Sequence, residues 1–217
     1  MKKIKPVDPE IGISEERAII KTLRSGFWAS GSGNGKVQKF ERKISKYLGS
    51  DQCIAVNSGT AALNITLSLL DIRNHEVIIP SLSFVSTANC VLTNGGKPVF
   101  VDVNPNTLCI EPETILKSIT KKTKAIIPVH FGGMSCDIEK ILELSSKYGV
   151  KVVEDAAHAA GASYNKNKIG SHGFAVCFSF HPIKNLAMPT GGLIAINDKN
   201  HEKIRETIQS KRWCGIA

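Results

Sequence analysis

The sequence contains no long apolar run and few aromatic residues. Only 6% of its 217 residues are Phe, Trp or Tyr, and no stretch approaches the roughly 20 apolar residues that a membrane-spanning helix requires. The first ten residues, MKKIKPVDPE, are basic but no apolar segment follows them, so we expect no signal peptide and a cytoplasmic location. With 42% hydrophobic and 22% charged residues, the composition is that of a soluble globular protein, and we expect no membrane partner.

Paired cysteine motifs are also absent. The six cysteines show no CxxC pair and no zinc-type spacing. Cys53, Cys90 and Cys177 lie within apolar patterns, where a free thiol behaves as a small hydrophobic side chain. The cysteines therefore argue against a disulfide framework and fit a reducing compartment.

Acidic residues are outnumbered, since 19 Asp and Glu stand against 28 Lys and Arg, which gives a net charge of +9. The lysines are scattered, and the densest cluster, LKSITKKTKAII, contains no interleaved aromatic residue. Nucleic-acid binding requires a concentrated basic face, so we expect no nucleic-acid partner. The same charge would suit an anionic small-molecule substrate.

The chain begins with two predicted helices and continues as alternating strands and helices. The segment 14–26, SEERAIIKTLRSG, has Ser14 as its expected cap and Gly26 as its stop, and the segment 35–49 has apolar residues at helical spacing. Seven short apolar runs, most of them followed by a helical pattern, predict strands at 53–57, 76–80, 98–103, 125–131, 151–155, 175–180 and 192–197. We therefore expect an α/β fold, a three-layer α/β/α sandwich around a mainly parallel seven-stranded sheet.

No linker, repeat or low-complexity segment divides the chain. Residues 1–217 are therefore expected to form one domain, with 1–35 as an N-terminal helix and loop. The stretch GSGNG at 31–35 lacks the full dinucleotide-binding fingerprint, and no convincing strand precedes it. We predict a flexible loop there.

Chemically useful residues follow several of the predicted strands, at the ends where sheets of this kind bind ligands. The turn at 57–60 is either an ordinary helix cap or a phosphate site made of backbone N–H groups. Phe84 is either a core residue or an exposed aromatic face, and Asp155 with His158 is either an ordinary loop pair or part of a site. Lys184 is either the first solvated residue of a loop or an amine at the edge of the core, where desolvation lowers its pKa and makes it a nucleophile.

An anion site, an aromatic face, a carboxylate and a lysine are together what pyridoxal 5'-phosphate (PLP) requires. The phosphate needs the anion site, and the flat ring can stack on an aromatic side chain. The ring nitrogen needs a carboxylate that keeps it protonated, and the aldehyde needs a lysine. A lone Asp-x-x-His pattern is weak evidence for a metal, so we expect PLP as cofactor and no metal.

From about Ser25 to its end, the sequence resembles the sugar aminotransferases of the DegT/DnrJ/EryC1/StrS family, which are fold-type I PLP enzymes. The resemblance rests on the stretches GSGNGKVQKFERKISKYLG, CIAVNSGTAALNITL, VIIPSLSFVSTANCVL, GGKPVFVDVNPNTLCI, KAIIPVHFGG, VVEDAAHAAGA and FSFHPIKNL. The stretches VVEDAAHA and FSFHPIKN are close to diagnostic of this family.

The resemblance implies a role for each matching residue. Lys184 would bind the cofactor aldehyde covalently and move a proton between substrate and cofactor, while Asp155 would pair with the ring nitrogen. Phe84 would stack on the ring. His158 stands at a position, often glutamine in the family, beside the ring hydroxyl. The phosphate contacts would come from Ser58, Gly59, Thr60 and Ser179.

The implied reaction is transfer of an amino group, with glutamate as the expected donor, to a keto group of a nucleotide-linked deoxysugar. The product would serve surface polysaccharide or other glycan biosynthesis, and the enzyme would act as a homodimer. Two alternatives stay open. One is a sugar dehydratase of the same family, whose members carry histidine in place of the lysine; the other is a non-catalytic PLP-binding fragment.

Two features depart from the family pattern. After the lysine the family usually has Gly-Glu-Gly-Gly, whereas this chain has AMPTGG, with Pro189 and Thr190 at the first two of those positions. The family is also about twice as long and has a C-terminal small domain that supplies part of the substrate site. We expect that domain to be absent from this chain.

Overall fold

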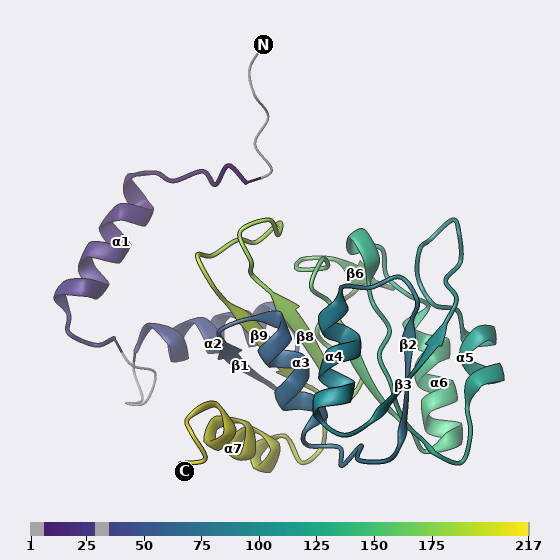
Figure 1. Ribbon diagram of the computed structural model, residues 1–217. Helices are drawn as coiled ribbons and strands as arrows, with labels where there is room; N and C mark the ends of the chain where they lie inside the picture. The colour runs from purple at the N-terminus through teal and green to yellow at the C-terminus, as the bar shows by residue number, and fades with distance from the viewer. Residues whose placement is uncertain (1–6, 29–34, 217) are drawn as a thin grey trace.

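A seven-stranded sheet forms the centre of the computed structural model, which describes residues 7–28 and 35–216 (Figure 1). The expected loop at 31–35 lies, apart from Gly35, outside the described residues. The strand order across the sheet is β1-β9-β8-β5-β4-β2-β3. These strands are β1 (Gln52–Val56), β2 (Glu76–Pro80), β3 (Lys97–Val101), β4 (Thr123–Ile126), β5 (Lys151–Asp155), β8 (Ala175–Ser179) and β9 (Gly192–Ile196).

Most neighbouring strands are parallel, and β9 alone among the strands of this sheet runs against both of its neighbours, β1 and β8. The carboxyl ends of β1, β2, β4, β5 and β8 therefore lie at the same edge of the sheet, together with the start of β9. The predicted α/β class and the mainly parallel seven-stranded sheet are confirmed.

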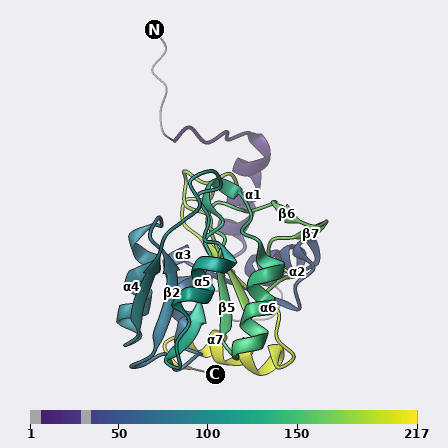
Figure 2. The ribbon, with the colours of Figure 1, turned by 90° about the vertical axis from the view of Figure 1, so that its right-hand side faces the viewer.

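Helices cover both faces of the sheet. Figure 2 shows α3 and α4 on one side and α2 and α6 on the other. The apolar contacts agree: α3, α4 and α7 pack on one face, while α2, α5 and α6 pack on the opposite face. The helices are α2 (Lys36–Leu48), α3 (Gly59–Leu67), α4 (Val85–Thr93), α5 (Pro112–Ser118), α6 (Ile138–Tyr148) and α7 (His201–Arg212), with a short 3₁₀ turn, η1 (Phe131–Gly133).

The side chains of strand β2 are apolar on both faces of the sheet, so helices must pack on both faces to bury them. Its side chains alternate, so Val77 and Ile79 enter the core beneath α3 and α4, while Ile78 enters the core beneath α5 and α6. All three side chains are fully buried. A continuous apolar strand of this kind is typical of a parallel sheet that is covered on both faces.

Three details differ from the sequence-based expectations. Helix α1 (Ile13–Arg24) begins before Ser14, because the backbone N–H of Gly12 bonds to Glu15 and closes the first turn there. Helix α7 was not predicted, since only Ile208 on it is buried. The segment after β5 was expected to be a loop, but it contains a small hairpin of β6 (Ser163–Tyr164) and β7 (Asn167–Lys168).

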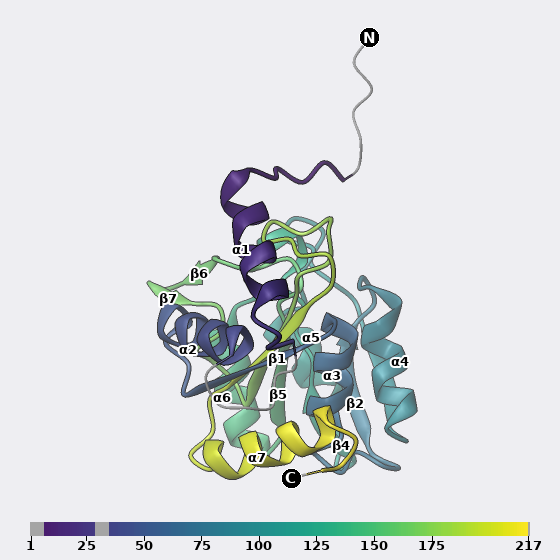
Figure 3. The same cartoon turned by 90° about the vertical axis from the view of Figure 1, so that its left-hand side faces the viewer.

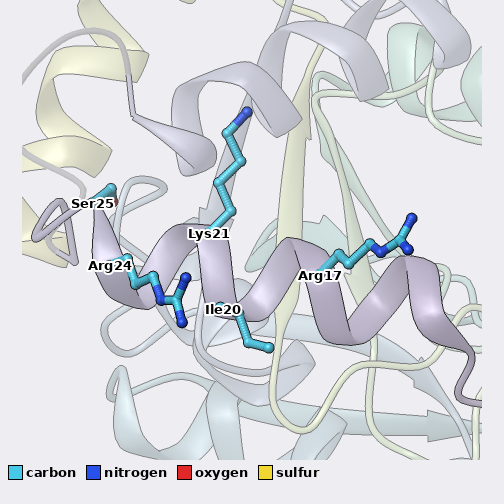
Figure 4. Close-up of a pocket in the computed structure, with 5 residues that line it drawn as sticks. All are labelled: Arg17, Ile20, Lys21, Arg24 and Ser25. Atoms are coloured by element: carbon cyan, nitrogen blue, oxygen red, sulfur yellow. The ribbon is translucent and has the colours of Figure 1, made fainter.

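Helix α1 stands away from the sheet, as Figures 1 and 3 show, and none of its residues is buried. Its apolar side chains Ile19, Ile20 and Leu23 are exposed. Arg17, Lys21 and Arg24 form a basic stripe along the helix beside a shallow hollow (Figure 4). Helix α1 and Ser25, which directly follows it, supply all the residues of that hollow, so it brings no separate parts of the chain together.

No helix within residues 7–28 and 35–216 has the length and apolarity needed to cross a membrane.

A buried ion pair connects α2, β1 and α7 across 171 positions of sequence. Glu41 Oε1 accepts hydrogen bonds from Arg212 Nη1 at 2.7 Å and from the backbone N–H of Ala55 at 2.9 Å. Arg212 Nη1 also donates to the carbonyl of Ala55 at 3.0 Å. Both charged side chains are largely buried, Glu41 at 10% and Arg212 at 17% exposure, so removing either one leaves the other buried without its partner.

Replacing Glu41 with alanine should destabilise the fold, because it leaves the Arg212 charge and the Ala55 N–H without their acceptor. We expect the free energy of unfolding to fall by about 2–4 kcal/mol. Urea denaturation followed by circular dichroism measures this change. The matched control is Glu143→Ala on the exposed face of α6, which should change stability by less than about 0.5 kcal/mol. Equal effects of the two substitutions would contradict the role given to the pair.

Candidate active site

A cavity of about 330 Å³ opens at the edge of the sheet where the parallel strands end. Residues following β1, β2, β4, β5 and β8, together with the residues just before β9, line it. The structure therefore brings together all eight residues that the sequence suggested, namely Ser58, Gly59, Thr60, Phe84, Asp155, His158, Ser179 and Lys184.

Asp155 is the last residue of β5 and has only 5% of its surface exposed. Its Oδ2 accepts a hydrogen bond from Thr87 Oγ1 at 2.9 Å, and its Oδ1 accepts one from the Ala157 N–H at 3.2 Å. Burial raises the pKa of the Asp155 carboxyl above its usual value, and these hydrogen bonds oppose the rise. The site therefore contains a carboxylate whose charge is costly unless a cation lies beside it.

Lys184 lies on the loop between β8 and β9 and is half-buried. Its backbone N–H donates to the carbonyl of His181 at 2.8 Å, which fixes a turn just before the lysine. Burial lowers the pKa of the Lys184 amine, while the charge of Asp155 acts in the opposite direction. A lowered pKa increases the neutral fraction of the amine, which is the form that attacks a carbonyl carbon.

The turn between β1 and α3 is held close to β8 and β9 by glycines. A side chain at Gly59 would lie 2.8 Å from Ser179 Cβ, and one at Gly192 would lie 2.3 Å from the Ser58 carbonyl carbon. Ser58 Oγ accepts a hydrogen bond from the Ala61 N–H at 3.1 Å, so Ser58 is the cap of α3. The first N–H groups of a helix have no partner within it, and here they lie at the cavity wall, where an anion can be bound.

Phe84 is 72% exposed and lines the cavity, so it is not a core residue. It immediately precedes α4, the helix that also carries Thr87, the hydrogen-bond partner of Asp155. The ring therefore offers an open aromatic face near the buried carboxylate.

His158 also lines the cavity, and the η1 turn holds its ring. The backbone N–H of Gly132 donates to His158 Nδ1 at 3.2 Å, and the ring of Phe131 packs edge-on against the imidazole at 5.6 Å between centroids. Burial lowers the pKa of His158, with a further lowering from the charge of Lys184 and a rise from that of Asp155.

Behind η1 lies a fully buried pair that the sequence analysis did not identify. His130 Nε2 and Glu154 Oε2 are 2.8 Å apart, and the Cys136 N–H donates to His130 Nδ1 at 3.2 Å. Both side chains of the pair have no exposed surface. Glu154 precedes Asp155 in β5, so the pair connects η1 to the strand that ends in the buried carboxylate.

The unusual stretch AMPTGG lies against the turn that precedes α3. Thr190 Oγ1 donates to the carbonyl of Asn57 at 2.6 Å, and Gly191 forms a bridge with Ser58. Pro189 and Thr190 line the cavity. Thr190 thus ties the lysine loop to the turn that precedes α3, a contact that no sequence signal indicated.

No group of three or more His, Cys, Asp or Glu residues is arranged to hold a metal ion within residues 7–28 and 35–216. The groups that line the cavity include an amine, a buried carboxylate, the imidazoles of His158 and His181, the ring of Phe84 and the N–H groups at the start of α3.

Replacing Asp155 with asparagine should change how the stability of the cofactor-free protein depends on pH. The pKa of the Asp155 carboxyl is higher in the folded protein than its unfolded value of about 3.8. Such an acid contributes its full stabilisation below the unfolded pKa, and this contribution is lost as the pH rises through the pKa of the folded state. Relative to the wild type, Asp155→Asn should therefore gain stability between acidic and neutral pH, as measured by urea denaturation across that range.

The control is Asp71→Asn, which removes an exposed carboxyl group from a turn where the backbone suits asparagine equally well. Its stability should follow the pH dependence of the wild type. If Asp155→Asn also follows the wild type, the Asp155 carboxyl is not desolvated in the folded protein.

Comparison with known proteins gives a consistent set of relatives. The chain is 43% identical over 199 residues to the spore coat polysaccharide biosynthesis protein SpsC of Bacillus subtilis (strain 168), covering 91% of this chain and 50% of SpsC. Among solved structures, it is similar to Helicobacter pylori PseC, an aminotransferase involved in the biosynthesis of pseudoaminic acid. That match has a TM-score of 0.92 and 29% identity, and it covers 100% of this chain and 57% of PseC.

A second solved structure, Spr1654 from Streptococcus pneumoniae in its PLP form, matches with a TM-score of 0.88 and 28% identity, covering 96% of this chain and 57% of Spr1654. The chain thus spans about half the length of the relatives it matches. The family model described as the DegT/DnrJ/EryC1/StrS aminotransferase family matches residues 9–216. The chain belongs to this family.

Proposed function

We propose that the chain is the cofactor-binding part of a PLP-dependent sugar aminotransferase. The proposed reaction moves an amino group, with glutamate as donor, to a keto group of a nucleotide-linked deoxysugar used in surface polysaccharide or other glycan biosynthesis. The observation that carries the proposal is the placement of the buried Asp155 carboxylate and the Lys184 amine at one cavity. SpsC, whose name assigns it to spore coat polysaccharide biosynthesis, and PseC support the sugar pathway.

The residues around the cavity fit PLP in charge and shape. A buried carboxylate with a raised pKa is suited to a cationic ring nitrogen, because a cation restores its charged form. The exposed face of Phe84 suits a flat ring, and the close approach at Gly59 places the start of α3 where an anion can meet backbone N–H groups. Spr1654 has been solved in forms with PLP and with its aminated counterpart, PMP.

Each residue has a role that its surroundings support. Asp155 holds the ring nitrogen protonated, and Thr87 fixes the orientation of that carboxylate. Lys184 would hold the aldehyde through Nζ and, because the pKa of its amine is lowered, could accept and return a proton there. When bound, PLP supplies an aldehyde that takes up the amino group and a ring that withdraws electrons from the reacting carbon.

The phosphate group is assigned to the turn that opens α3 and to the end of β8. Ser58, Gly59 and Thr60 offer backbone N–H and hydroxyl groups at the positive end of α3, and Ser179 faces the same cavity. Thr190 holds this turn against the lysine loop through the carbonyl of Asn57, so the phosphate and aldehyde contacts are fixed relative to each other.

The proposed partners are small molecules and a second copy of the chain. The net charge of +9 suits a nucleotide-linked, anionic sugar, and the site is expected to work in the cytoplasm. Homodimerisation is consistent with the exposed apolar side chains of α1, since surfaces of this kind are usually covered in an assembly. Lys184, in a cavity with Asp155, favours amino transfer over the dehydratase alternative, whose members carry histidine at this position.

Borohydride reduction of the PLP-loaded protein, followed by peptide mapping, should place the pyridoxyl group on Lys184. The half-buried amine with a lowered pKa is the best nucleophile in the cavity. Lys184→Arg should abolish the label, whereas Lys199→Arg on an exposed turn should leave it unchanged. A pyridoxyl group on another lysine would overturn the assignment.

Incubation of the PLP-loaded chain with glutamate should convert PLP to PMP slowly, with release of 2-oxoglutarate, and Lys184→Arg should block the conversion. We expect turnover with a sugar ketone to be poor. The chain spans about half of its relatives, and misplacing a substrate by about 1 Å can cost roughly a hundredfold in rate.

Chromatographic quantification of PLP and PMP measures this half-reaction. Capture of PLP without any PMP would favour the non-catalytic alternative. Equal PMP formation by the wild type and by Lys184→Arg would contradict the role of the lysine.

A further inference from the structure

The hydrogen bond from the Gly132 N–H to His158 Nδ1, at 3.2 Å, determines which nitrogen of the His158 ring carries the proton. A backbone N–H can only donate, so His158 Nδ1 must accept and therefore carries no proton. A neutral imidazole has one N–H, which places the proton of His158 on Nε2. Nε2 makes no hydrogen bond to any other described residue and is the ring nitrogen left for a ligand in the cavity.

The surroundings of His158 also favour the neutral ring. The charged groups that act on it are Lys184, which repels an imidazolium, and Asp155, which attracts one. Burial is the largest effect and acts in the same direction as Lys184, so the pKa of His158 is lowered. Protonation of Nδ1 would in addition place two N–H groups face to face at the Gly132 contact.

The η1 turn is built so that the Gly132 N–H stays in place. Gly132 and Gly133 have φ angles of +60° and +87°, which other residues rarely adopt. A side chain at Gly133 would lie 3.1 Å from the His158 carbonyl oxygen. Immediately before the turn, His130 accepts from the Cys136 N–H through Nδ1, so its Nε2–H donates to the buried Glu154.

We propose that Gly132 selects the neutral Nε2–H tautomer of His158, so that this side chain can only donate a hydrogen bond to the oxygen on the ring of the bound cofactor. The inference rests on the proposed function for the identity of the acceptor, but the tautomer is a property of the cofactor-free chain. A donor at this place favours the deprotonated form of the ring oxygen. His158 then acts on the electronic state of the cofactor, whereas Gly132 is a positioning residue.

The tautomer can be measured without any cofactor. Long-range ¹⁵N–¹H correlation spectra of histidine-labelled protein report which ring nitrogen carries the proton, and the His158 signal is assigned by its loss in His158→Gln. We expect Nδ1 to be unprotonated, with the pKa of His158 lowered from the usual 6.5 by burial and by the charge of Lys184. His75 is the internal reference, because its Nδ1 faces the carbonyl of Arg73 at 2.9 Å and must carry a proton. A protonated Nδ1 on His158 at neutral pH would overturn the proposal.

Two glycines provide a matched test of the proposal that Gly132 selects the tautomer of His158. Gly132 and Gly149 both have left-handed φ angles, +60° and +67°, and a side chain at either position would meet nothing within 4 Å. Gly132→Val and Gly149→Val therefore impose similar strain, but only the first distorts the turn that contacts His158. We expect Gly132→Val to mix the two tautomers or raise the His158 pKa, and Gly149→Val to do neither. An unchanged His158 spectrum in Gly132→Val would contradict the role of Gly132 in selecting the tautomer.

The effect on the cofactor is read from the absorbance of the PLP-loaded protein as a function of pH. His158→Phe lacks the donor, so it should raise the pH at which the absorbance of the bound cofactor changes. His158→Gln can still donate, so its transition should lie close to that of the wild type. Identical titrations for all three proteins would show that His158 does not donate to the cofactor. If PLP does not bind at all, the proposed function fails, while the NMR result still decides the tautomer.

Discussion

The buried carboxylate of Asp155 is the constraint around which the site is arranged. A carboxylate at the end of a central strand loses most of its hydration, and two hydrogen bonds from Thr87 and Ala157 restore only part of that loss. The remaining electrostatic cost of the Asp155 charge would be reduced by a cation bound in the cavity. Binding of a cation beside Asp155 would compensate for this local cost, which is a common relation between stability and function.

The geometry that serves this carboxylate comes from parallel strands and close glycine contacts. Because six of the seven strands end at one edge, residues as far apart in sequence as Ser58 and Lys184 line the same cavity. The absence of side chains at Gly59 and Gly192 lets the turn before α3 lie directly against β8 and β9. Thr190 then adds one hydrogen bond between the two loops. The groups of the cavity thus lie at the ends of strands or on the loops that directly follow them.

Much of the fold and of the candidate site could be predicted from the sequence, for physical reasons. Apolar runs that alternate with helical patterns identify the covered parallel sheet, and local motifs identify the strand-end residues. The contacts that were missed are nonlocal or weakly patterned. The Glu41–Arg212 pair joins positions far apart in the chain, and the His130–Glu154 pair is recognisable only when both side chains are known to be buried. Helix α7 has a single buried residue, so its apolar pattern is faint.

Three ionisable groups that line the cavity, Asp155, His158 and Lys184, have pKa values shifted toward their neutral forms. Burial is the first cause in each case: it raises the pKa of Asp155 and lowers those of Lys184 and His158. The attraction between Asp155 and the two bases opposes these shifts but does not reverse them. A simple ion in this cavity would meet only one complementary group. A flat zwitterion with a cationic nitrogen, an electrophilic carbon and a distant anion would meet all of them at once, at the carboxylate, the neutral amine and the start of α3.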